Sequence, residues 1–272
     1  MPGEAETREF YRNEYRRLYK GALQPKPHHV LRGARAARDR LQWLAPHLQS
    51  VGRWLDVGAG SGEFAFLMRR KGMQVLALEP NLGYAGFVRQ SLGIEVQEGF
   101  LEDLDPAGGQ FDGISLFHVL EHHPDPVGAL ARLRAMLAPG GILALEVPNA
   151  EFDPVHPEKR FHPAHLVAFC RENLEASALA AGLAPAEIRA SADGGVLFGV
   201  FHAAGIVRPV RPSPALVSRL LERERSQSRL RYYSSPIVWA RTIRRLTCLV
   251  AERFNARSAA APQAFLERFP LR

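Results

Sequence analysis

The chain of 272 residues has only two cysteines, Cys170 and Cys248, and no apolar run long enough to cross a membrane. Two such cysteines form neither a disulfide framework nor a metal-binding motif, which favours a reducing compartment. The first six residues are polar and acidic, unlike a signal peptide. We therefore expect a cytoplasmic protein without a membrane-spanning helix.

Acidic residues are scarce in the last part of the chain, and the net charge of +7 is unevenly spread. Residues 1–50 carry +5, residues 51–206 carry −8 and residues 207–272 carry +10. An acidic centre argues against a groove that follows nucleic-acid phosphates, so nucleic acid is not an expected partner. The basic C-terminal helices leave contact with an anionic surface open. Nothing in the sequence indicates an oligomeric state.

Hydrophobic residues make up 46% of the chain, enough for one α/β domain with additions. From residue 51 predicted strands alternate with predicted helices, which indicates a parallel sheet with right-handed crossovers. We predict an N-terminal helical cap (1–49), an α/β domain (50–206) and a basic helical extension (207–272). Strands are predicted at residues 51–57, 74–79, 94–97, 111–117, 141–147, 183–190 and 196–203. Helices are predicted at residues 7–20, 30–44, 61–71, 81–91, 125–137, 171–181, 214–233 and 236–256.

The first predicted strand is not followed by the G-x-G-x-x-G spacing of a dinucleotide site. Instead, three glycines alternate in the run Asp56-Val57-Gly58-Ala59-Gly60-Ser61-Gly62-Glu63. Glycines allow backbone conformations that side chains forbid, and they let a ligand approach closely. The two carboxylates beside this turn would repel a pyrophosphate. They suit a cationic sulfonium ligand that carries an amino group.

This glycine run resembles the first motif of the class I S-adenosylmethionine-dependent methyltransferases, and the resemblance covers residues 50–205. It implies a Rossmann-like, seven-stranded, mostly parallel sheet closed by an antiparallel hairpin, with S-adenosylmethionine as cofactor. Glu79 ends the second predicted strand, where a carboxylate can accept both ribose hydroxyls. The residues that the resemblance assigns to cofactor binding are Asp56, Gly58, Ala59, Gly60, Gly62, Glu79, Pro80, Leu101, Glu102 and Phe117.

Histidines gather after the fourth and fifth predicted strands, where the resemblance places the methyl acceptor. Transfer to a hydroxyl benefits from a general base whose pKa lies near neutrality, which favours histidine. In one interpretation, His118 or His165 is that base. In another, Glu121 and His122 only tie the loop together.

A third interpretation of these residues is a site for a divalent metal, made by His118, Glu121, His122 and His165. The H-x-x-E-H spacing could put three ligands on one helical face. It is similar to a metal-dependent branch of the superfamily, although that branch has an acid where His118 stands. We expect no metal and take His118, His122 and His165 as the candidate catalytic residues.

The sequence thus predicts a methyltransferase that is O-directed and acts on a small-molecule or glycan-type acceptor. An N- or C-methyltransferase with the same cofactor site is one alternative. A non-catalytic S-adenosylmethionine-binding protein that engages a partner through its basic helices is another. We expect the helix at 7–20 to be a scaffold that packs on the core. The alternative is that it caps the substrate, with Tyr11, Tyr15 or Arg12 touching the acceptor. No residue pattern identifies the acceptor.

Overall fold

The computed structural model describes residues 3–49, 51–106, 109–153, 155–156, 158, 162, 164–205, 213–226, 228–243, 246–247 and 262–268. The chain divides into two compact units. The first unit is Met1–Ser115 with Ala251–Arg272, and the second is Leu116–Val250. The three-part division made from the sequence stays a prediction.

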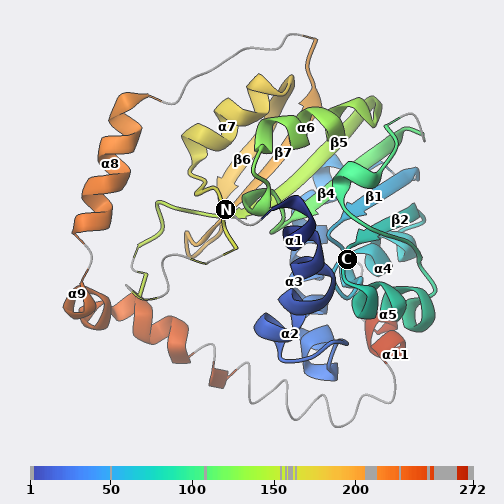
Figure 1. The fold of residues 1–272 in the computed structure, drawn as a ribbon, viewed down its shortest axis with the longest axis horizontal. Helices are drawn as coiled ribbons and strands as arrows, with labels where there is room; N and C mark the ends of the chain where they lie inside the picture. Colours follow the sequence, from blue (N-terminus) through green and yellow to red (C-terminus); the bar gives the residue numbers. More distant parts are fainter. Residues whose placement is uncertain are drawn as a thin grey trace. The chain divides into compact units, whose positions relative to one another are not determined.

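Seven strands form one sheet, which confirms the predicted Rossmann-like architecture (Figure 1). The strands are β1 (Arg53–Val57), β2 (Gln74–Glu79), β3 (Glu95–Glu98), β4 (Phe111–Phe117), β5 (Leu137–Pro148), β6 (Leu183–Ala190) and β7 (Val196–Ala203). Their order is β3-β2-β1-β4-β5-β7-β6. β1 pairs in parallel with β2 and β2 with β3, whereas β7 pairs antiparallel with both β5 and β6. The order reverses between β1 and β4, and ligands of such sheets bind near this reversal, beyond the carboxyl ends of the strands.

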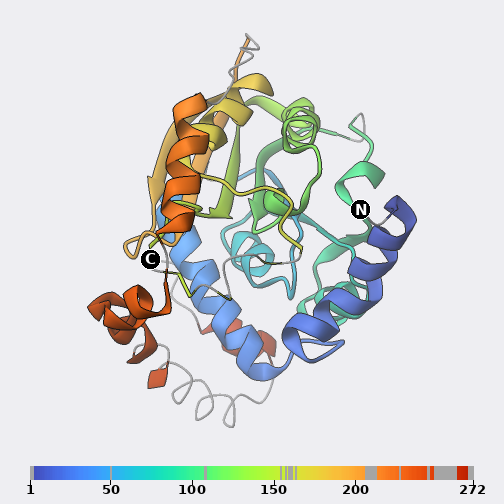
Figure 2. The same cartoon turned by 60° about the vertical axis from the view of Figure 1, so that its left-hand side comes forward.

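The helices of the first unit differ from the prediction mainly at their starts. They are α1 (Glu4–Glu9), α2 (Tyr15–Lys20), α3 (Pro27–Leu44), α4 (Glu63–Arg70), α5 (Leu82–Leu92) and α11 (Pro262–Glu267). A π-helical turn at Phe10–Glu14 joins α1 to α2, so the predicted helix 7–20 is one helical run from residue 4 (Figure 2). Pro27 occupies the first turn of α3, where a missing N–H costs nothing, so this helix starts three residues early.

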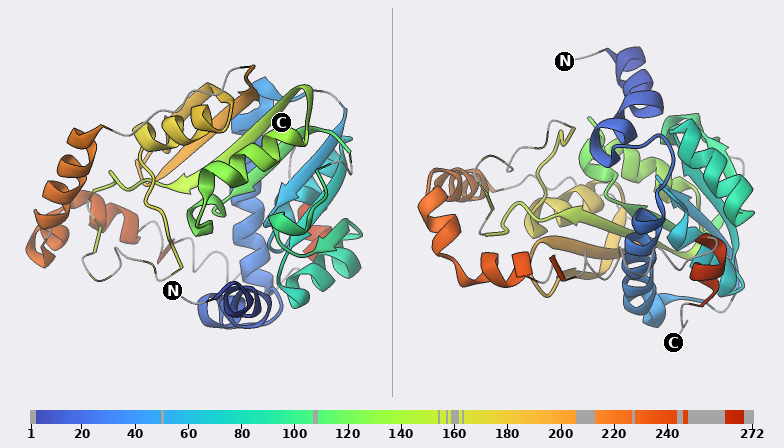
Figure 3. Two further views of the ribbon diagram at one scale, coloured as in Figure 1. Left: turned by 45° about the horizontal axis from the view of Figure 1, so that its top comes forward. Right: turned by 90° about the horizontal axis from the view of Figure 1, so that it is seen from below.

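The core of the first unit forms where α3 and α11 pack on α4 (Figure 3). α3 buries the residues that recur at helical spacing, namely Val30, Leu31, Ala34, Ala37, Leu41 and Leu44. Leu266 of α11 is fully buried, and its carbonyl accepts a hydrogen bond from Arg70 Nη1 at 2.8 Å. The end of the predicted basic extension therefore contributes to the core of the first unit.

The helices of the second unit are α6 (Pro126–Ala135), α7 (Arg171–Ala180), α8 (Pro214–Arg225) and α9 (Arg229–Ser234). Asp125 caps α6 by accepting a hydrogen bond from Gly128 N at 2.9 Å. α7 packs on α6 and β6, and Phe169 and Phe201 are buried in this unit. The predicted helix 236–256 lies partly outside the described residues, and so does Cys248.

Arginines of residues 213–247 form ion pairs with acids of the same unit. Arg219 lies 3.0 Å from Glu151, and Arg231 lies 2.7 Å from Asp153. Further pairs are Arg229 with Glu158 and Arg241 with Asp193. Exposed pairs each add little stability, so these contacts hold the segment only weakly. Contact with an external anionic surface stays a prediction. No helix in the described part of the chain combines the length and apolar composition that crossing a bilayer requires.

Candidate functional site

The glycine turn after β1 needs glycine at each of its three alternate positions. Gly58, Gly60 and Gly62 have φ angles of 69°, 59° and 79°, in the left-handed region that other residues avoid. A side chain at Gly62 would also come within 2.9 Å of Val88. The N–H groups of Gly58 and Ala59 both donate to Leu78 O, at 2.8 and 3.0 Å. The turn is therefore fixed to the end of β2.

Glu79 at the end of β2 is fastened to this turn. Its side chain is 1% exposed, and its Oε2 accepts a hydrogen bond from Gly60 N at 2.7 Å. Its Oε1 accepts one from Asn81 N at 3.1 Å. The two backbone donors hold the carboxylate in a set orientation beside the turn. Arg16 Nη2 also donates to Oε2, at 3.0 Å.

Asp56, the last acid of β1, is held by a chain of buried hydrogen bonds. Trp54 Nε1 donates to Ser115 Oγ at 2.9 Å, and Ser115 Oγ donates to Asp56 Oδ1 at 2.6 Å. Burial raises the pKa of Asp56 to about 6, although the hydrogen bond from Ser115 opposes this shift. On the other side of the turn, burial raises the pKa of Glu63 to about 7. A cationic ligand would favour the ionised form of both acids.

Replacing Ser115 by alanine tests this chain of hydrogen bonds. Trp54 and Asp56 would each lose a buried partner, so the free energy of unfolding should fall by about 1–3 kcal/mol. Chemical denaturation measures the change. Ser177→Ala is the matched control, because Ser177 only donates to the Asn173 carbonyl within α7, and it should cost less than about 0.5 kcal/mol. Equal losses in the two variants would contradict the role of Ser115.

Three further residues predicted to bind the cofactor follow β2 and β3 of the first unit. Pro80 follows Glu79 directly, and Leu101 is buried at the start of a short 3₁₀ turn that places Glu102 on the surface. Phe117 is different, because it ends β4 in the second unit. The first unit thus brings together the predicted cofactor residues from Asp56 to Glu102.

His118 of the second unit lies between two carboxylates. Its Nε2 is 2.6 Å from Glu146 Oε1, and its Nδ1 is 3.4 Å from Glu121 Oε1. The backbone of His118 has a φ of 55°, and its N–H donates to Glu146 O at 2.8 Å. Burial lowers the pKa of His118, but the hydrogen bonds and charges of Glu121 and Glu146 outweigh burial and raise it to about 9. His118 is therefore an imidazolium at neutral pH, a form that cannot accept a proton.

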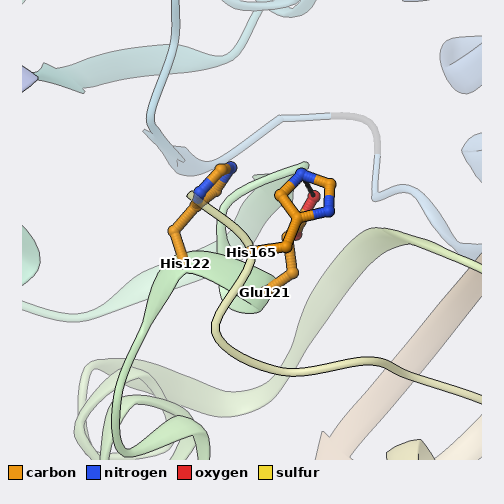
Figure 4. A group of neighbouring side chains, drawn as sticks. All are labelled: Glu121, His122 and His165. Atoms are coloured by element: carbon orange, nitrogen blue, oxygen red, sulfur yellow. Dashed lines mark ion pairs between the residues drawn. The ribbon is translucent and has the colours of Figure 1, made fainter. Parts of the chain in front are cut away.

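His165 has the opposite protonation state. It lies in the loop after β5 with its Nε2 3.9 Å from Glu121 Oε1 (Figure 4). Burial, reinforced by the neighbouring histidines, lowers the pKa of His165 to about 4. Its ring stacks on His162 at 4.3 Å and meets His122 edge-on at 4.9 Å. The backbone next to His165 is held at Glu121, because Leu166 N donates to Glu121 O at 2.8 Å.

Three of the four predicted metal ligands also lie together. Glu121, His122 and His165 each offer one ligand atom, and these atoms lie within 4.8 Å of one another. The carboxylate of Glu121 is 1% exposed, and a carboxylate beside two imidazoles is a donor set that suits a divalent cation. His118 is not part of this group, and its Nε2 lies 2.6 Å from Glu146 Oε1 instead.

Comparison with known proteins assigns the chain to a family. The family described as "Methyltransferase domain" matches residues 28–185, more than half of the chain. The chain belongs to this methyltransferase family. S-adenosylmethionine is the cofactor of its class I members.

The relatives of this methyltransferase are similar over part of their length. The ubiquinone biosynthesis O-methyltransferase of Xanthomonas axonopodis pv. citri (strain 306) is 32% identical over 131 residues, which are 46% of this chain and 53% of the relative. The chain thus spans about half the length of the curated relatives it matches.

Two solved structures share the fold of this methyltransferase. One is the 1,6-didemethyltoxoflavin-N1-methyltransferase of Burkholderia thailandensis, with a TM-score of 0.58 and 22% identity over 75% of this chain and 92% of that one. The other is the [4+2]-cyclase SpnF, with a TM-score of 0.54 and 16% identity over 63% of this chain and 82% of that one. A cyclase with this fold means that the fold alone does not determine the reaction.

Proposed function

We propose that this methyltransferase transfers the methyl group of S-adenosylmethionine to a hydroxyl oxygen of a small-molecule acceptor. The observation that carries the proposal is the pairing of His165, a neutral imidazole, with the buried carboxylate of Glu121. The pKa of His165 lies below the near-neutral value that is best for a base, so its ring is unprotonated before the reaction but weakly basic. The nearby carboxylate of Glu121 offsets this weakness, because it favours the imidazolium that forms when the ring accepts a proton. The name of the O-methyltransferase relative supports oxygen as the methylated atom.

The residues of the first unit fit the cofactor. The alternating glycines leave backbone without side chains at the turn, and Glu79 presents a buried carboxylate beside it. We assign the ribose hydroxyls to Glu79 and the amino end of the ligand to Asp56 and the glycine turn. When bound, S-adenosylmethionine supplies a methyl group activated by a sulfonium.

We assign removal of the acceptor hydroxyl proton to residues of the second unit. We assign proton removal to His165, which takes the acceptor hydroxyl proton as the O–CH₃ bond forms and the S–CH₃ bond breaks. His118 serves as a positioning residue, because its imidazolium holds the Glu121 carboxylate in place. This assignment favours His165 over His118 as the base, although the sequence offered both.

An NMR titration of the histidine side chains tests the two protonation states without any acceptor. We expect His165 to titrate near pH 4, because burial lowers its pKa from 6.5, and His118 near pH 9, because Glu121 and Glu146 raise its pKa. His165→Gln and His118→Gln variants assign the two signals. A His165 signal that titrates well above pH 7 would contradict its role as the base, because the ring would then be protonated at neutral pH.

The same shifts set the sign of the pH dependence of stability. Because the pKa of His118 is raised in the folded state, its stabilising contribution is complete below pH 6.5 and is lost as the pH rises through 9. Because the pKa of His165 is lowered, stability is lost as the pH falls from 6.5 through 4. These two groups together favour maximal stability near pH 6.5.

A metal-assisted transfer is the second candidate, and the observation that favours it is the grouping of Glu121, His122 and His165. A bound divalent cation would hold the acceptor oxygen and lower the pKa of its hydroxyl. Activity would then be abolished by a chelator and restored by added divalent cation. Under the lead proposal the chelator has no effect on the rate.

A screen for methyl transfer identifies the acceptor class. The purified protein, radiolabelled S-adenosylmethionine and separate pools of phenols, sugars with free hydroxyls and amines are incubated together. We expect label in the hydroxyl pools, on oxygen. A glycan-type acceptor would place the label in the sugar pool, and label only in the amine pool would favour the N-methyltransferase.

A further inference from the structure

Arg16 of α2 lies on the carboxylate to which we assign the cofactor ribose. Its Nη2 is 3.0 Å from Glu79 Oε2, and its side chain is only 18% exposed. The guanidinium carbon lies 4.6 Å from the ring centre of Tyr84, and a side chain at Gly60 would come within 3.5 Å of Nη2. Arg16 therefore covers both the glycine turn and the acid at the end of β2.

The acceptor sites of Glu79 are almost all in use. A carboxylate has about four lone-pair sites, two on each oxygen. Oε2 accepts from Gly60 N and Arg16 Nη2, and Oε1 accepts from Asn81 N. Two neighbouring ribose hydroxyls need one site on each oxygen. Oε2 becomes available only if Arg16 withdraws, since the backbone donors form the turn itself.

Further contacts join the helical run of residues 4–20 to the turn after β3 and to the start of α5. Arg8 pairs with Asp103, and its guanidinium carbon lies 4.5 Å from the ring centre of Phe100. Asn81 Nδ2 donates to Arg12 O at 2.7 Å. None of the residues in this run whose burial is described is buried. Polar contacts and aromatic edges rather than an apolar core hold the run, so its release costs little.

We propose that residues 4–20 are a latch on the cofactor site, in which Arg16 and the cofactor ribose compete for Glu79. This inference rests on the proposed cofactor site. When the ribose hydroxyls bind Glu79, Arg16 leaves and the run loosens. The charge of Arg16 compensates the buried Glu79 carboxylate while the latch is closed. The closed fraction lowers the apparent affinity for the cofactor, as in any equilibrium between competent and incompetent states.

Arg16→Met tests the latch, with Arg17→Met as the matched control. Methionine keeps an unbranched apolar stem but has no charge and donates no hydrogen bond. Arg17 serves as the control because it pairs with the exposed Glu14 at 2.5 Å. The probe is S-adenosylhomocysteine, titrated by calorimetry. We expect Arg16→Met to bind it about tenfold more tightly than the wild type and Arg17→Met to match the wild type. Weaker or unchanged binding by Arg16→Met would overturn the latch.

Hydrogen exchange on the wild type gives a second readout that does not depend on a variant. We expect amides of residues 8–20 to exchange faster when S-adenosylhomocysteine is bound. Slower exchange would mean that the run closes over the ligand, and that result would overturn the latch while leaving the proposed cofactor site intact. Absence of binding by both the wild type and Arg16→Met would overturn the cofactor site and the latch together.

Discussion

His165→Gln is expected to lower the rate of methyl transfer about 10²–10⁴-fold while cofactor affinity stays within about twofold of the wild type. Glutamine preserves much of the size and polarity of histidine but cannot serve as a base at neutral pH. The loss should appear in kcat, because the base acts only in the reaction and not in binding. Single-turnover kinetics with an acceptor from the screen, together with calorimetry for S-adenosylhomocysteine, measure the two effects separately.

His156→Gln is the control for this variant, because His156 precedes His165 in the same loop, where it contacts Tyr232 and Tyr233 and accepts a hydrogen bond from Glu158 N at 3.3 Å. We expect it to keep the wild-type rate. A wild-type rate in His165→Gln would place the base elsewhere or indicate an acceptor that needs none, such as an amine. A loss in His165→Gln that accompanies chelator sensitivity of the wild type would favour the metal-assisted candidate instead.

Glu79→Ala is expected to weaken binding of S-adenosylhomocysteine about 30- to 150-fold. The variant loses a bidentate, charge-assisted pair with the ribose, worth about 2–3 kcal/mol. It also leaves Gly60 N and Asn81 N without their carboxylate partner, so the turn is less well ordered. Calorimetric titration of the variant and the wild type measures the change.

Glu98→Ala is the matched control, because Glu98 is the neighbour of Glu79 in the register of β2 and β3. Its side chain is 40% exposed and pairs with Arg89 on the surface. We expect Glu98→Ala to bind the ligand as the wild type does. Similar losses in both variants would mean that any acid at this edge of the sheet matters, which would remove the specific role of Glu79.

The parts of the fold that depend on local pattern could be predicted from the sequence. The alternation of strands and helices indicates the sheet, and the alternating glycines indicate the turn because their left-handed φ angles are a property of single residues. Glu79 could also be identified as a candidate from local pattern, because it ends the second predicted strand. Its carboxylate accepts a hydrogen bond from Gly60 N, and its role with the ribose stays a proposal.

The contacts that decide the chemistry join residues far apart in the sequence. Arg16 is 63 residues from Glu79 and is one of many arginines in the N-terminal part, so no local signal distinguishes it. Ser115 reaches Asp56 across 59 residues from the middle of β4. The pKa of His118 is raised in part by Glu146, which lies on β5 and is 28 residues away in the sequence. Residue spacing alone does not show this contact, so the sequence left His118 and His165 as equal candidates for the base.

Calorimetric titration of the wild-type protein with S-adenosylhomocysteine and, separately, with NADH tests the central claim most directly. The cofactor site described here predicts a dissociation constant in the micromolar range for S-adenosylhomocysteine, about −7 to −8 kcal/mol, and no heat of binding with NADH. Binding of NADH without binding of S-adenosylhomocysteine would contradict it, because the glycine turn and Glu79 would then serve a dinucleotide.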